Sequence, residues 1–134
     1  MTEWNFADLW EACAEVRQDG LALAHGDETT SWRNFNSSAN GVASAMLAAG
    51  VSHQDKVAQY LYNCPEYLIS VFACFKAALV PVNTNYRYTA DELAYLWDNA
   101  DAVAVVVDTL QFLESRCGQR DPSAHHGLLE EHIG

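Results

Sequence analysis

Histidine and glutamate side chains gather near the end of the chain, and both types can bind a metal ion. His125, His126 and His132 could supply imidazole nitrogens, and Glu130 and Glu131 could supply carboxylate oxygens. A helical zinc site has the pattern H-E-x-x-H, and this segment lacks that spacing. We therefore interpret these residues as a solvated tail and predict no metal-binding residue in the chain.

Serine and glycine residues offer neither an activated nucleophile nor a phosphate cradle. Ser37, Ser38 and Ser44 lie in a segment with helical spacing, outside any G-x-S-x-G turn of the kind that presents a catalytic serine. The chain contains neither G-x-G-x-x-G nor G-x-x-x-x-G-K-[ST], whose backbone amides would hold phosphates. The sequence therefore disfavours a hydrolase and a self-contained nucleotide site, and we predict no catalytic and no cofactor-binding residue.

Asp108 follows a β-branched run, which is where a receiver domain carries its phospho-accepting aspartate. Such a site also needs further acids and a lysine at neighbouring strand ends. Lys56 and Lys76 are the only lysines in the sequence, and the predicted elements do not place either one there. The sequence therefore argues against a receiver domain.

Helical spacing of apolar residues marks the first part of the chain. Asn5 is suited to cap a helix whose apolar face comprises Phe6, Leu9, Trp10, Cys13 and Val16. Residues 21–24 and 29–32 predict two short strands around a turn that contains Gly26. The most regular helical pattern runs from Trp32, and Gly50 is suited to end it in a left-handed conformation.

Strands and helices alternate in the second part. The predicted strands are residues 57–61, 80–82 and 102–107. One intervening helix begins near Pro65, and the other begins at a capping box formed by Thr89 and Glu92. Pro81 favours a sheet edge for its strand, and Ala102–Val107 has the composition of a strand buried on both faces. The predicted fold class is α/β, a parallel βαβαβ unit preceded by a helix and a small hairpin.

Five aromatic side chains fall on the apolar faces of the predicted helices. They are Trp10, Phe35, Phe72, Phe75 and Trp97. Rings at helical spacing are more often core residues than parts of a ligand cage, so we predict a packing role for them.

Composition narrows the partners and the compartment. Eighteen acidic and seven basic residues give a formal net charge of −11, which repels phosphate backbones, so we predict no nucleic-acid partner. No apolar run approaches the ~20 residues of a membrane span, and the first residues do not resemble a secretory signal. Cys13, Cys64, Cys74 and Cys117 form no C-x-x-C pair, which predicts free thiols and a cytoplasmic location.

Several short strings, taken in order, resemble the amino-terminal part of adenylate-forming acyl-CoA synthetases. The strings are Thr30-Ser31-Trp32, Gly50-Val51, Asp55-Lys56-Val57, Asn63-Cys64-Pro65-Glu66, Phe75-Lys76-Ala77, Val80-Pro81-Val82-Asn83, Asn85-Tyr86-Arg87-Tyr88, Asp91-Glu92-Leu93 and Asp98-Asn99-Ala100-Asp101. Their order and spacing from about Trp4 to Val107 carry the resemblance. The string that begins at Asn85 is most similar to the actinobacterial fatty-acyl and sterol side-chain ligases.

The resemblance implies that a carboxylate attacks ATP to give an acyl-adenylate, after which CoA displaces AMP. It implies ATP, Mg and CoA as cofactors of a full-length family member. The family's phosphate loop, adenine motif, ribose-binding aspartate and carboxy-terminal lysine have no counterpart in this sequence. We therefore expect a truncated, inactive amino-terminal fragment whose partner is the remainder of a ligase or a second copy of itself.

The sequence also departs from the family. Gln54 and Ala78 stand where the family usually has glycine, and from about Cys117 the residues no longer resemble it. We therefore divide the chain into an α/β segment, residues 1–108, and a tail of uncertain origin, residues 109–134. The leading alternative is a stand-alone interaction or regulatory α/β module without catalysis. An unrelated flavodoxin-like domain is disfavoured, because no phosphate-binding loop follows the first parallel strand.

Overall fold

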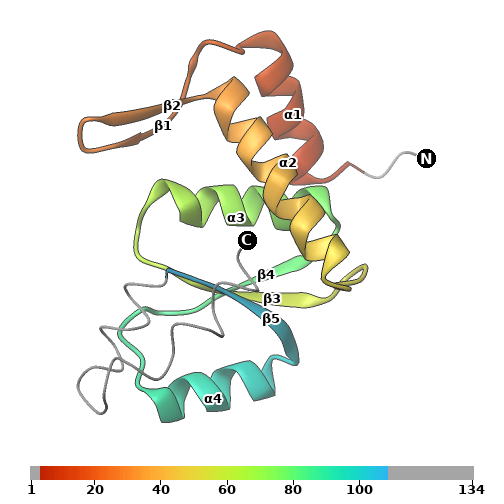
Figure 1. Ribbon diagram of the computed structural model, residues 1–134, viewed down its shortest axis with the longest axis vertical. Coiled ribbons are helices and arrows are strands. Elements are labelled where there is room, and N and C mark those ends of the chain that lie inside the picture. Colours follow the sequence, from red (N-terminus) through yellow and green to blue (C-terminus); the bar gives the residue numbers. More distant parts are fainter. Residues whose placement is uncertain (1–3, 109–134) are drawn as a thin grey trace.

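The computed structural model describes residues 4–108, which form a layered α/β unit. Its elements are α1 (Phe6–Val16), β1 (Leu21–His25), β2 (Glu28–Ser31), α2 (Trp32–Ala48), β3 (Lys56–Tyr60), α3 (Pro65–Lys76), β4 (Val80–Asn83), α4 (Ala90–Asn99) and β5 (Ala102–Val107). Figure 1 shows α1, α2 and α3 on one side of the parallel sheet and α4 on the other, with the β1–β2 hairpin projecting away. The predicted fold class is confirmed.

The parallel sheet has the strand order β4-β3-β5. Val57, in the central strand, pairs with Pro81 on one side and with Ala104 on the other. Pro81 therefore lies in an edge strand of the described sheet, as its missing N–H group predicts. The hairpin β1–β2 is antiparallel and forms a separate sheet.

Side-chain caps determine where α1, α2 and α4 begin. The Oδ1 atom of Asn5 accepts from two N–H groups of the first turn, the shorter bond measuring 2.6 Å. Asp8 completes a capping box by accepting from the Asn5 N–H at 2.8 Å. Ser31 caps α2, and Thr89 and Glu92 form the predicted capping box of α4.

Three helices end in a residue with a left-handed backbone. The φ angles are 93° at Gly50, 55° at Ala78 and 54° at Asp101. After α3, the N–H of Leu79 donates to the carbonyl of Cys74 at 2.8 Å, which satisfies a terminal carbonyl of the helix. The predicted role of Gly50 is confirmed, whereas Ala78 adopts a conformation that a Cβ atom disfavours.

The main core contains an aromatic cluster between the first three helices. Phe35 and Phe72 are almost wholly buried, and their ring centres lie 4.9 Å apart. Trp10 packs edge-on against Phe72 at 5.1 Å and against Phe75 at 5.8 Å. Trp97 belongs to a smaller cluster between the sheet and α4. The predicted packing role of these five aromatic residues is confirmed.

In helix α1, only part of the apolar face that the sequence pattern predicted is buried. Trp10 packs into the core beside the buried Ala7, whereas Phe6, Leu9 and Val16 are 63%, 56% and 80% exposed. Small alanine side chains allow α1 to approach its neighbours closely. The helix therefore buries its alanine side and leaves several larger apolar side chains in solvent.

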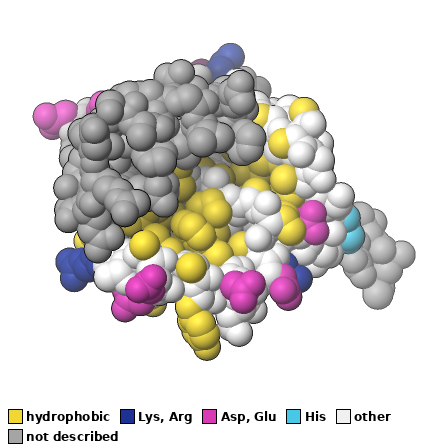
Figure 2. Space-filling view, turned by 60° about the horizontal axis from the view of Figure 1, so that its bottom comes forward, with side chains coloured by type: hydrophobic (Ala, Val, Ile, Leu, Met, Phe, Trp, Pro, Cys, Tyr) yellow, Lys and Arg dark blue, Asp and Glu magenta, His cyan; other side chains and the backbone are white. Residues whose placement is uncertain are grey.

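Strand β5 is less buried than its composition predicts. Val107 is buried beside α4, but Val103 is 59% exposed, so the prediction of burial on both faces is wrong at the start of this strand. The reason is that α4 packs near the carboxyl half of β5, where Leu93 and Trp97 cover Val105 and Val107. Figure 2 shows apolar surface on the α4 side of the molecule, with acidic side chains near it.

Candidate functional site

The carboxyl edge of the parallel sheet is the candidate site, because α/β sheets bind ligands beyond the ends of their strands. The strands β3, β4 and β5 end at Tyr60, Asn83 and Val107. The segments that follow β3 and β4 carry tyrosine, asparagine and threonine side chains. These groups can donate and accept hydrogen bonds, but at neutral pH they do not form an acid–base pair.

Two hydrogen bonds hold the loop after β4 against the sheet and α4. The Tyr60 hydroxyl donates to the carbonyl of Tyr86 at 3.2 Å, and the indole N–H of Trp97 donates to Thr84 Oγ1 at 3.2 Å. Thr84 and Tyr60 are buried, so these bonds are shielded from water. The loop that contains the asparagine-tyrosine-arginine string therefore has a fixed start.

A tyrosine joins the first turns of α3 to the end of β4. The Tyr67 hydroxyl donates to Asn83 Oδ1 at 2.7 Å, and partial burial raises the pKa of this tyrosine. Nearby, the rings of Tyr62 and Tyr86 lie 4.9 Å apart, and the Arg87 guanidinium stacks 5.4 Å from the Tyr86 ring. Within residues 4–108, Arg87 is the only basic residue in the segments that follow β3, β4 and β5.

A cavity of about 600 Å³ opens beside this edge, between β1 and the start of α3. It is lined by Ala22, Leu23, Ala24, His25, Asn63, Cys64, Pro65, Tyr67 and Leu68. Desolvation is the main cause that raises the pKa of Cys64, which keeps this thiol protonated and a poor nucleophile at neutral pH. Cys74 lies in the core, where burial raises its pKa to about 11. Neither thiol is activated.

The structure separates the residues that were considered for catalysis. Ser37, Ser38 and Ser44 are exposed on α2. Lys56 is the first residue of β3, at the amino ends of the parallel strands, whereas Asp108 follows β5 at their carboxyl ends. Among the described residues no group of three histidine, cysteine or acidic side chains could hold a metal. The histidines and glutamates after residue 124 lie outside the described residues.

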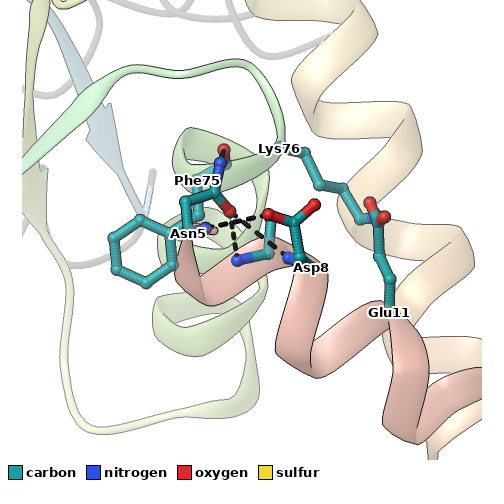
Figure 3. Close-up of polar contacts among 6 residues, drawn as sticks. Asn5, Asp8, Glu11, Phe75 and Lys76 are labelled. Atoms are coloured by element: carbon teal, nitrogen blue, oxygen red, sulfur yellow. Dashed lines mark hydrogen bonds and ion pairs between the residues drawn. The ribbon is translucent and has the colours of Figure 1, made fainter. Parts of the chain in front are cut away.

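Lys76 has a structural role that the sequence did not reveal. Its ammonium group contacts Glu11 at 2.6 Å and lies 4.4 Å from the centre of the Phe72 ring, and its side chain is 8% exposed. Figure 3 shows this pair beside the α1 capping box, where Asn5 also donates to the carbonyl of Phe75 at 3.5 Å. Lys76 therefore anchors α1 on α3. Its partner is remote in sequence, which is why no local pattern indicated it.

Comparison with known proteins decides the family. A family model described as "AMP-binding enzyme" matches residues 10–131. The chain belongs to this family. The resemblance to adenylate-forming enzymes is thus confirmed, and the carboxyl edge described above is part of an AMP-binding fold.

The curated relatives of this chain include actinobacterial ligases, as its sequence strings predicted. It is 38% identical over 102 residues to a medium/long-chain-fatty-acid–CoA/3-oxocholest-4-en-26-oate–CoA ligase of Mycobacterium marinum, a match covering 76% of this chain and 18% of that protein. It is 34% identical over 102 residues to a 3-oxocholest-4-en-26-oate–CoA ligase of Rhodococcus rhodochrous. That match covers 76% of this chain and 18% of the Rhodococcus protein. The chain therefore spans about a fifth of these relatives.

Solved structures agree on the fold. The anthranilate CoA ligase AuaEII in complex with anthranoyl-AMP matches with a TM-score of 0.76 and 26% identity, over 86% of this chain and 23% of that one. A benzoate CoA ligase from Burkholderia xenovorans LB400 matches with a TM-score of 0.78 and 19% identity, over 88% and 24% of the two chains. Within residues 4–108, no helix has the length and apolar character needed to cross a membrane.

Proposed function

We propose that this chain forms the first α/β segment of an ATP-dependent acyl-CoA ligase, which adenylates a carboxylate and then makes a CoA thioester. The observation that carries the proposal is the 38% identity with the Mycobacterium marinum ligase over 102 residues. The chain's string at Asn85–Tyr88 and its place among mycobacterial and rhodococcal relatives favour a fatty-acyl or sterol side-chain carboxylate as the substrate.

In this proposal the segment contributes scaffold, and ATP, Mg and CoA bind through other parts of a ligase. The sequence supports this division of roles, because it contains no glycine-rich phosphate loop and no counterpart of the family's catalytic lysine. We propose the division of the chain at residue 108 because the strings that resemble the family end near Val107, although the family model itself extends to residue 131. Free thiols at Cys13, Cys64 and Cys74 fit the reducing cytoplasm that we propose as its location.

A segment exchange tests the proposal. The matched segment of the Mycobacterium marinum ligase would be replaced by the corresponding residues of this chain, and acyl-CoA formation would be measured with fatty acids and with 3-oxocholest-4-en-26-oate. A ligase scaffold should support turnover within about tenfold of the parent enzyme. The same chimera with Ala58→Asp, in the buried centre of β3, is the control and should lose activity by misfolding.

A folded chimera without activity would contradict the proposal. That result would favour the alternative, a stand-alone interaction module that has kept the fold but no longer fits the ligase around it. Cooperative thermal unfolding of the chimera, measured beside that of the parent, shows whether an inactive protein is folded.

A further inference from the structure

One edge of the β1–β2 hairpin has no partner strand in the part of the chain that the structure describes. There, β1 pairs only with β2, in a sheet of two strands. A two-stranded hairpin is marginally stable in water, and proteins usually protect an unpaired edge with charged residues or proline. Strand β2 begins with Glu28, whereas β1 has the sequence Leu-Ala-Leu-Ala-His, without proline, lysine or an acidic residue. The edge of β1 therefore lacks the usual protection against pairing.

The register of the hairpin shows which backbone groups of β1 point away from β2. Gly26 and Asp27 form the two-residue turn, so His25 and Glu28 are the hydrogen-bonded pair next to it. Bonded and non-bonded positions alternate along an antiparallel pair, which directs the N–H and C=O groups of Ala24 outward. Among residues 4–108, no residue outside the hairpin forms a backbone hydrogen bond with Ala24.

The cavity of about 600 Å³ between β1 and α3 lies along this edge. Its lining includes four consecutive residues of β1, 22–25. Successive side chains of a strand point to opposite faces, so four residues in a row line a cavity that runs along the edge of the strand. Figure 1 shows β1 as the strand of the hairpin nearer to α3. The outward backbone groups of Ala24 therefore face the cavity.

The opposite wall of the cavity is largely apolar. It includes Pro65 and Leu68 from the first turns of α3, and Leu68 is 40% exposed. Tyr67 also lines the cavity, but its hydroxyl already donates to Asn83. No acidic residue, lysine or arginine lies in the lining, which disfavours a charged ligand because its charge would have no partner there. The cavity thus offers backbone hydrogen bonds on one side and apolar contact on the other.

We propose that the edge of β1 pairs with a β-strand from the part of the ligase that this chain lacks. This inference rests on the proposed function, since the chain spans about a fifth of its curated relatives and most of such a ligase lies outside it. The added strand forms hydrogen bonds with the backbone of Ala24 and directs an apolar side chain toward Pro65 and Leu68. It extends the hairpin to three strands and fills the cavity beside α3.

Amide hydrogen exchange at single-residue resolution tests this pairing in the full chain and in the ligase chimera described above. In the full chain, the Ala24 amide should exchange within about tenfold of the rate of an unstructured peptide. In the chimera it should exchange about 100-fold more slowly, because the added strand accepts from it. Thr29 pairs with Ala24 and directs its own N–H to the far edge of β2, so its amide should exchange alike in both proteins.

Fast exchange of the Ala24 amide in a folded chimera would overturn the proposal. Slow exchange in the full chain would also overturn it. Slowing that increases with protein concentration would assign the edge to a second copy, and slowing at every concentration would assign it to other residues of this chain. Exchange does not depend on turnover. An inactive chimera with a protected Ala24 therefore contradicts only the proposed function, and an active chimera with an unprotected Ala24 contradicts only this inference.

Proline variants compare the two edges of the hairpin. Ala24→Pro removes the outward N–H of β1, and Thr29→Pro removes that of β2. Proline is tolerated where the N–H of an edge strand faces solvent, so both variants should change the melting temperature of the full chain by similar amounts. In the chimera, Ala24→Pro should lower the melting temperature by about 2 °C or more beyond Thr29→Pro. Equal effects of the two variants in the chimera would overturn the proposal.

Discussion

Gln54 and Ala78 adopt the backbone conformation that glycine favours, with φ angles of 64° and 55°. They are also the two positions where the sequence departs from the glycine usual in the family. The N–H of Gln54 donates to the carbonyl of Ala78 at 2.8 Å, so the two residues join the loops that lead into β3 and β4. The family resemblance indicated each position separately, but only the structure shows that both have a left-handed backbone and that the two residues are in contact.

Replacing Ala78 with glycine should stabilise the protein. A left-handed alanine costs about 1–2 kcal/mol, and part of the gain is lost because glycine makes the unfolded chain more flexible. We expect Ala78→Gly to raise the free energy of unfolding by about 1 kcal/mol in urea denaturation. Gly50→Ala, at the matching position after α2 with a φ of 93°, should lower it by a similar amount. A loss of stability for Ala78→Gly, or a gain for Gly50→Ala, would contradict this explanation.

At the scale of elements, local signals predicted the helices and strands, but not their faces. The caps at Asn5 and Thr89, the stop at Gly50 and the alternation after residue 56 all act between near neighbours, and each was confirmed. The buried face of α1 and the exposure of Val103 depend on which elements pack nearby. No pattern within one element contains that information.

The anchoring of α1 gives a test at this scale. Glu11 and Lys76 are separated by 65 residues, and the lysine side chain is 8% exposed against 44% for the glutamate. Glu11→Gln should cost about 1–2 kcal/mol of unfolding free energy, because it leaves a nearly buried ammonium without its partner. Lys76→Met removes both the charge and the need for a partner, and should cost less than Glu11→Gln.

The exposed pair of Arg33 and Asp19 is the matched control, with side chains 58% and 90% exposed. Asp19→Asn should change the unfolding free energy by no more than ~1 kcal/mol, because solvent screens this pair. If Glu11→Gln costs no more than Asp19→Asn, the buried pair does not anchor α1.

On the scale of the whole molecule, large apolar side chains are exposed on several elements. Trp4, Phe6, Val16, Tyr95 and Val103 are each more than half exposed. Exposed apolar side chains are what we expect where the rest of a larger ligase, as proposed above, would cover this segment.

The isolated chain should therefore bind a hydrophobic dye or associate. We expect enhanced fluorescence of anilinonaphthalene sulfonate, or a mass by light scattering that rises with concentration. Val103→Lys and Phe6→Lys should reduce both signals, because they place a charge at exposed apolar positions. A monomeric protein that unfolds cooperatively and does not enhance the fluorescence of the dye would contradict the claim that an apolar contact surface is exposed.

The sequence predicted the α/β fold and the family, since each rests on short strings and local periodicity. It could not predict the carboxyl-edge contacts, such as Tyr67 with Asn83 or Trp97 with Thr84, because each joins residues from different elements.

Exchange of labelled pyrophosphate into ATP is the measurement that tests the central claim, that this chain supplies scaffold and does not itself perform adenylation. Attack on the α-phosphate requires donors or cations that stabilise charge on the phosphoryl oxygens, and the sequence offers no glycine-rich cradle for them. With ATP, magnesium and fatty acids of several lengths, the purified chain should show no exchange above a heat-treated control. Exchange that persists at constant specific activity through successive purification steps would contradict the account.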